Sequence, residues 1–171
     1  MEFVAVLTSA SAKCQLTGRN PPLGDKDATC IAEALRESSI AVLDLASNNI
    51  TMCGAEDLAA AIRTNSTIAH LSVADNLIGD EGALSFAAAL KFDGCLRQLE
   101  LQGNSIGNRG VAAIAEVLES NQVLQVLLLQ RNQIECQGLA AMVQSLHTNE
   151  SLDTLDVSAN KIGDTGKSAL A

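Results

Sequence analysis

Apolar residues recur along the chain in two patterns that follow one another. In stretches such as Leu99-Glu100-Leu101 apolar and polar positions alternate, as expected for a strand with one buried face. Further along, Ile114 and Leu118 stand four residues apart, a spacing that places both on one face of a helix. The chain is therefore predicted to consist of short strands, each followed by an amphipathic helix.

This strand–helix pattern returns every 28 residues. Three sets of equally spaced residues mark the period: Leu43, Leu71, Leu99, Leu127 and Leu155; Asn48, Asn76, Asn104, Asn132 and Asn160; and Gly54, Gly82, Gly110, Gly138 and Gly166. Self-similarity of this length is the signature of a stacked repeat protein. The leucines are expected to line the core. The asparagine amides are expected to pair with backbone groups left open where the chain turns, and to stack into a ladder.

The repeat can be written Leu-x-x-Leu-x-Leu-x-x-Asn-x-Ile, followed by an apolar helix with a glycine near its start. It resembles the leucine-rich repeats of the ribonuclease-inhibitor-like class, over about residues 12–171. That class includes the cytosolic ribonuclease inhibitor, the receptor ends of NOD-like immune proteins and the Ran GTPase-activating protein. The resemblance implies an α/β solenoid, a right-handed β-α superhelix with a concave parallel sheet and convex helices. It implies protein binding, although one fold hosts many functions.

We expect a single domain over residues 1–171. Residues 1–11 are interpreted as an N-terminal cap, with an interaction arm as the alternative, and residues 12–39 as a degenerate first repeat. In that repeat Asn20 is aligned with Asn48, and one residue is inserted before Leu23. Four full repeats span residues 40–151.

An incomplete last repeat spans residues 152–171, and no polar C-terminal cap follows it. An uncovered solenoid end would expose an apolar face. Three explanations stay open: further repeats continue the chain, another subunit covers this end, or the end frays.

Charge narrows the range of partners. The net charge is −9, with 11 Lys and Arg against 20 Asp and Glu. A nucleic-acid or anionic membrane surface requires clustered basic residues, so neither partner is expected. A protein with a basic surface fits the charge better. Aromatic residues make up 2% of the chain, so the core is predicted to be aliphatic.

The cysteines point to a reducing compartment. They are Cys14, Cys30, Cys53, Cys95 and Cys136, an odd number without a CxxC pair. This usage is typical of intracellular proteins, and no metal site or cofactor is expected. The N-terminal apolar run carries Glu2 and no basic residue before it, which disfavours a secretion signal.

Variable residues on the outer face of the predicted strands are the candidate site. Because consensus leucines point inward, the residues between them line the concave surface. The candidates are Asp44, His70, Ser72, Asp75, Gln98, Glu100, Val126, Leu128 and Asp156. Val126 and Leu128 would be apolar anchors, and Asp44, Glu100 and Asp156 would select a basic partner. The alternative is a solvated sheet face that binds nothing strongly.

Two residue groups raise the question of catalysis. His70 and Ser72 share one strand face, but no orienting group or oxyanion hole accompanies them, so both are interpreted as surface residues. Leu16-Thr17-Gly18-Arg19 resembles a Thr-Gly-Arg stretch that carries a functional arginine in the Ran GTPase-activating protein. Arg19 would then stabilise charge during phosphoryl transfer. The alternative is an ordinary turn residue.

These observations predict a non-catalytic protein-binding module, acting as a scaffold or docking subunit of an intracellular assembly. The expected location is cytoplasmic, for example cytoskeletal or ciliary. Two other functions follow from the resemblance: a GTPase activator of the Ran type that uses Arg19, and a sensor or inhibitor of the NOD-like or ribonuclease-inhibitor type.

Overall fold

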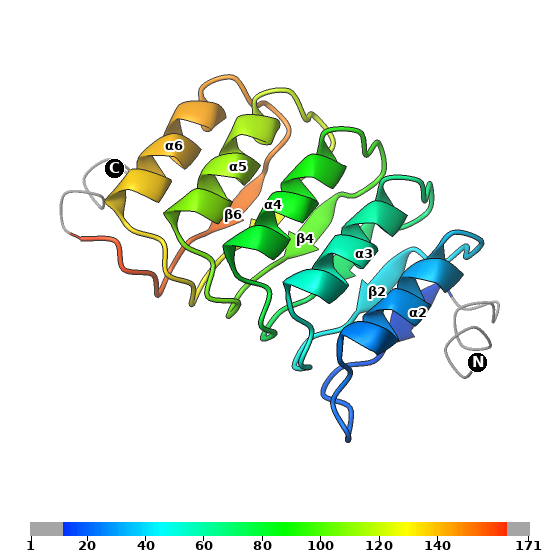
Figure 1. Cartoon of the computed structure of the whole chain (residues 1–171). Helices are drawn as coiled ribbons and strands as arrows, with labels where there is room; N and C mark the ends of the chain where they lie inside the picture. The colour runs from blue at the N-terminus through cyan, green and yellow to red at the C-terminus, as the bar shows by residue number, and fades with distance from the viewer. Residues whose placement is uncertain (1–11, 164–171) are drawn as a thin grey trace.

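The computed structural model describes residues 12–163 and contains six strand-led units stacked in sequence order (Figure 1). The strands are β1 (Lys13–Gln15), β2 (Val42–Asp44), β3 (His70–Ser72), β4 (Gln98–Glu100), β5 (Val126–Leu128) and β6 (Thr154–Asp156). The helices are α2 (Asp25–Leu35), α3 (Met52–Ile62), α4 (Gly79–Leu90), α5 (Asn108–Leu118) and α6 (Cys136–Leu146). All strands form one parallel sheet in the order β1 to β6, and the helices cover one of its faces (Figure 1). The predicted α/β solenoid is confirmed. The predicted N-terminal cap and the helix of the last repeat lie outside the described residues.

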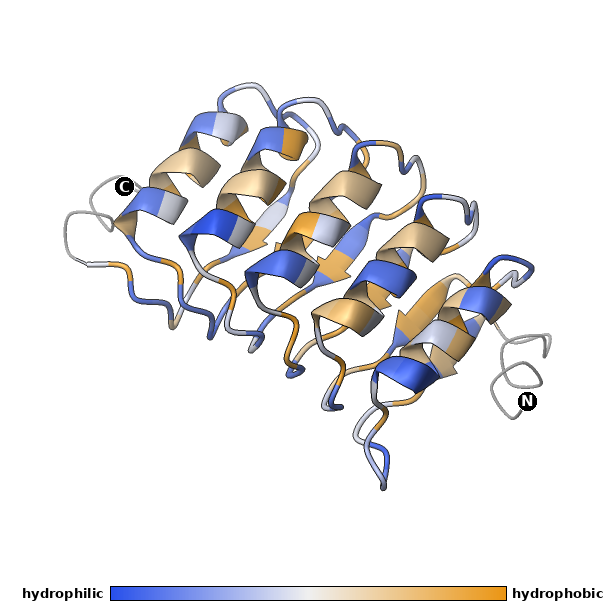
Figure 2. Cartoon of the chain, viewed as in Figure 1, coloured by the Kyte–Doolittle hydropathy of each residue, from blue (hydrophilic) through white to orange (hydrophobic). Residues whose placement is uncertain are grey.

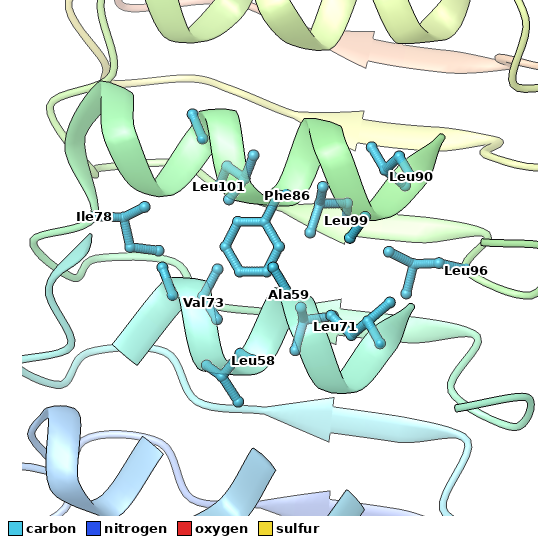
Figure 3. Close-up of a cluster of buried hydrophobic side chains, with 14 of the residues drawn as sticks. Leu58, Ala59, Leu71, Val73, Ile78, Phe86, Leu90, Leu96, Leu99 and Leu101 are labelled. Carbon is cyan, nitrogen blue, oxygen red and sulfur yellow. The ribbon is translucent and has the colours of Figure 1, made fainter. Parts of the chain in front are cut away.

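The core is the aliphatic layer between sheet and helices. Leu43, Leu99 and Leu127 are fully buried, and the strand register places each beside the equivalent leucine of its neighbour. Figure 3 shows the aromatic ring of Phe86, from α4, in the middle of such a cluster, among leucines of β3, β4 and α3. Because every unit contributes the same inward positions, the core runs continuously from unit to unit.

The buried asparagines hold successive turns together. The side-chain amide of Asn104 donates to the carbonyls of Val73 (2.9 Å), Leu101 (3.1 Å) and Gln102 (3.2 Å). Its Oδ1 accepts from the backbone N–H of Ile78. Asn48, Asn76, Asn132 and Asn160 donate in the same way. One side chain therefore satisfies backbone groups of two repeats, and the predicted ladder is confirmed.

The first repeat departs from the predicted alignment. Cys14 pairs with Leu43, which is an offset of 29 residues and places Arg19, not Asn20, in the asparagine column. Leu23 N–H donates to Asn48 Oδ1 as Ile50 N–H does to Asn76 Oδ1, so Leu23 corresponds to Ile50. Asn20, Pro21 and Pro22 therefore replace one residue, Asn49. The alignment of Asn20 with Asn48 was wrong because two residues, not one, are inserted here, within an exposed proline-containing turn.

A second ladder joins the helix starts. Asp80 Oδ1 accepts from the N–H groups of Gly107 (2.7 Å) and Gly110 (3.0 Å) at the start of α5. Asn108 Oδ1 accepts in the same way from Glu135 and Gly138 at the start of α6. Each of these side chains therefore caps the helix of the following repeat.

Asp25 does the same for α3, through the N–H groups of Thr51 (2.7 Å) and Gly54 (3.1 Å). Burial raises the pKa of Asp25, but hydrogen bonds from the Thr51 hydroxyl and from both N–H groups outweigh it and lower the pKa below the usual value. The ionised carboxylate is thus the form that holds the start of α3.

We predict that Asn104→Ala lowers the free energy of unfolding by about 3 kcal/mol, because it leaves buried backbone groups unsatisfied. Urea unfolding followed by circular dichroism measures the change. Asn49→Ala is the matched control, since Asn49 is exposed and stands next to a ladder position; its effect should stay below about 0.5 kcal/mol. Equal effects of the two substitutions would contradict the ladder's role.

Candidate protein-binding face

The face of the sheet turned away from the helices, here called the open sheet face, carries the predicted site residues. Both apolar and polar residues occur within the strands, as the hydropathy colouring shows (Figure 2). In β2 to β5 their alternation buries the central leucine and turns its neighbours outward, as in Val42 and Asp44 around Leu43. In-register pairing then aligns these outward residues in two rows. One row contains Val42, His70, Gln98, Val126 and Thr154, and the other Asp44, Ser72, Glu100, Leu128 and Asp156.

The structure brings five of the predicted residues around one shallow hollow of about 210 Å³ over β1 to β4, which Lys13 of β1 also lines. They are Asp44, His70, Ser72, Gln98 and Glu100. His70 is exposed, and Ser72 is buried with 9% relative exposure. Val126, Leu128 and Asp156 lie farther along the sheet and are half-buried.

Hydrogen bonds from nearby residues orient the carboxylates of this face. Asp44 Oδ1 accepts from Ala46 N–H at 3.0 Å, and Asp156 Oδ1 accepts from Ser158 N–H at 2.9 Å. The side-chain amide of Gln98 donates to Glu100 Oε1 at 2.6 Å. Because each carboxylate is held by a neighbour, little rotamer freedom is left to lose on binding.

Asp75, another of the predicted site residues, forms an ion pair with Arg131. Arg131 Nη2 lies 3.1 Å from both Asp75 carboxylate oxygens, although 56 residues separate the two. The pair passes over Gly103, where a Cβ atom would stand 2.1 Å from Asp75 Oδ1. Asp75 and Arg131 therefore neutralise one another at the edge of the open sheet face. The sequence contains a signal for this pair, since both residues occupy the same repeat column on either side of a glycine.

Gln102 and Gln130 were not among the predicted site residues. They occupy equivalent positions just after β4 and β5, and the Oε1 atom of each is buried without a hydrogen-bond partner among the described residues. An unsatisfied buried acceptor costs roughly 1–3 kcal/mol. These two unpaired acceptors are a feature of the face that periodicity alone does not reveal.

Among residues 12–163 no group of three His, Cys, Asp or Glu side chains is placed to hold a metal ion. None of the helices there has the length and apolar character needed to cross a bilayer.

Comparison with known proteins places the fold. A family model described as Leucine Rich repeat matches residues 64–87, 95–115 and 148–171, and each of these segments contains one strand of the sheet, β3, β4 or β6. The chain is a leucine-rich repeat protein. No curated protein sequence matches it.

Two similar solved structures support the same architecture. "Leiomodin-1 Actin-Binding Site 2 (ABS2)" aligns with a TM-score of 0.72 and 21% identity, covering 86% of each chain. The tropomodulin C-terminal domain of Caenorhabditis elegans aligns with a TM-score of 0.70 and 15% identity, covering 86% of this chain and 91% of that chain. At these identities the likeness is one of leucine-rich-repeat fold.

We predict that Gly103→Ala lowers the free energy of unfolding by about 2 kcal/mol, because Gly103 has a φ of +68° and its new Cβ would displace Asp75. Adding Asp75→Ala should recover part of the loss, leaving about 1 kcal/mol for the backbone conformation. Urea unfolding of both single variants and the double variant tests the coupling. Strict additivity would show that Gly103 does not make room for the Asp75–Arg131 pair.

Proposed function

We propose that this leucine-rich repeat protein binds another protein through its open sheet face. The observation that carries the proposal is the two in-register rows of outward side chains on a preformed sheet. Asp44, Glu100 and Asp156 supply negative charge, and Val126 and Leu128 supply an apolar patch. Such a face orders few groups on binding, so little of the interaction energy is lost.

The partner surface that fits best is basic, with an apolar patch toward one end. The row through β2 to β6 places Asp44 and Asp156 at its ends, with Glu100 and Leu128 between them. Opposite charges across an interface guide association and exclude acidic competitors. Apolar side chains that become buried in an interface, here Val126 and Leu128, supply much of the affinity.

For the cellular role, we propose a scaffold or docking subunit of a cytoskeletal assembly. The structural likeness to a leiomodin-1 actin-binding site supports this setting, and the fold provides a rigid surface with little chemistry of its own. A ciliary assembly is a further location consistent with a docking role. Co-sedimentation of the purified chain with filamentous actin tests the first setting, and an unchanged supernatant fraction would count against it.

The alternatives from the family resemblance gain no further support. Arg19 is exposed and stands in the asparagine-ladder column of a turn, which is consistent with a turn residue. A GTPase activator would accelerate GTP hydrolysis by a small GTPase and lose this activity on Arg19→Ala. Enzyme inhibition or immune sensing would use the same open sheet face, so identification of the partner decides between these roles and scaffolding.

We predict that the triple variant Asp44→Lys, Glu100→Lys, Asp156→Lys reduces affinity for the native partner about tenfold or more, through lost attraction and new repulsion. Leu128→Glu should have a similar effect by placing a charge in the apolar patch. The measurement is affinity capture from native cells with quantified partner recovery, then titration of the identified partner.

The control variant is Glu33→Lys, Glu116→Lys, Glu119→Lys, which makes the same charge change at exposed positions on the helical side. Partner recovery should be preserved in this control. If the open-face variants keep their partners while the helical-side control loses them, the assignment of the open sheet face is wrong.

A further inference from the structure

A groove runs between α3 and α4 on the opposite, helical side of the molecule. Its wider part, about 560 Å³, is lined by Met52, Glu56, Glu81, Leu84 and Ala88 among others. A narrower hollow of about 220 Å³ shares Glu56 and Ala88 with it and extends to Arg63. The groove therefore follows the two helices from their N-terminal to their C-terminal ends.

The groove opens where the helix-start ladder is interrupted. Asp25, Asp80 and Asn108 cap the following helix, but Met52 occupies this column in α3 and makes no such bond. Its side chain is 50% exposed. Leu77 is 62% exposed and lies beside Thr51 through an isolated β-bridge. Two of the three large exposed apolar side chains among the described residues thus meet at one corner.

Charge is segregated along the groove. Glu56 and Glu81 line its N-terminal half, where Glu81 also pairs with Arg109. Arg63 and Lys91 are the C-terminal caps of α3 and α4 and lie at the other end. The next residue, Phe92, is the third large exposed apolar side chain, at 68%. The groove is therefore apolar along its length, acidic at one end and basic at the other.

We propose that the α3–α4 groove binds an amphipathic helix of a partner protein, antiparallel to α3 and α4. The N-terminal half of that helix is acidic and faces Arg63 and Lys91, and its C-terminal half is basic and faces Glu56 and Glu81. This charge order also suits the helix's own dipole.

The size and floor of the groove fit such a helix. A partner helix packs between two neighbouring helices when their contact surface is smooth, and the small residues Ala60, Ala88 and Ala89 line the floor. The apolar stripe of the partner would cover Met52 and Leu84. Helices α3 and α4 have 11 and 12 residues, so a partner helix of about 14 residues, ~21 Å long, spans the groove.

The test uses a synthetic, fluorescently labelled helical peptide of about 14 residues, with a leucine stripe, glutamates in its N-terminal half and lysines in its C-terminal half. A second peptide has the same composition with the charges interleaved. Fluorescence anisotropy with the full chain should show at least tenfold tighter binding of the first. No binding of either peptide, or equal affinity for both, would overturn the proposal.

Met52→Asp is the decisive variant. Aspartate occurs at the equivalent positions Asp25 and Asp80, so this substitution should preserve the midpoint of urea unfolding. It should remove the apolar side chain of Met52 from the edge of the groove. We expect at least tenfold weaker binding of the segregated peptide, whereas Met52→Leu keeps it. Glu56→Lys should weaken binding as well, and Glu116→Lys on α5 should not. Unchanged binding by Met52→Asp would show that the peptide lies elsewhere.

Two further measurements separate this groove from other sites. Bound peptide should slow alkylation of the exposed Cys53, which lines the groove, but not of the exposed Cys30 on α2. The open-face triple lysine variant should bind the peptide normally, so the proposals for the two surfaces can be contradicted independently. If wild-type chain self-associates in sedimentation and Met52→Asp is monomeric, a second copy occupies the groove and the partner helix is refuted.

Discussion

The structure depends on one recurrent constraint, the satisfaction of backbone groups at the turn after each strand. A stack of parallel strands leaves carbonyl and N–H groups open at these turns, and burying them unpaired would cost more than a small domain can supply. Asn104 and its equivalents solve this by bonding to two successive turns. The bonds require neighbouring repeats to remain in register, and the register in turn aligns the leucines in the core.

The same constraint separates the residues that build the fold from those available for binding. Leu99, Leu101 and Asn104 are required for core packing and for the hydrogen bonds of the turns, so their identity says little about partners. Gln98 and Glu100, which stand between them, are free to vary without disturbing the core. A leucine-rich repeat protein of this kind therefore presents a recognition surface that can change independently of its stability.

Much of the architecture could be predicted because it is periodic. The leucine columns, the asparagine ladder and the outward position of Asp44 or Glu100 all follow from a 28-residue spacing. Features that break the period were harder to place. One inserted residue before Leu23 was predicted, but two are present, and Arg19 therefore stands in the ladder column.

Two interactions between repeats were also not predicted from the sequence pattern. The Asp75–Arg131 pair joins residues two repeats apart, and its geometry depends on the absence of a side chain at Gly103. The helix-start ladder through Asp80 and Asn108 lies outside the consensus columns. The interruption of this ladder at Met52 can be recognised only from the hydrogen bonds that Asp25, Asp80 and Asn108 make.

The most direct test of the account is hydroxyl-radical footprinting of the chain with and without its captured partner. If the scaffold presents the open sheet face as its binding surface, the side chains of His70, Val126 and Leu128 become protected in the complex. If these residues react as fast in the complex as in the free chain, while other residues become protected, the assignment of this face as the binding surface is contradicted.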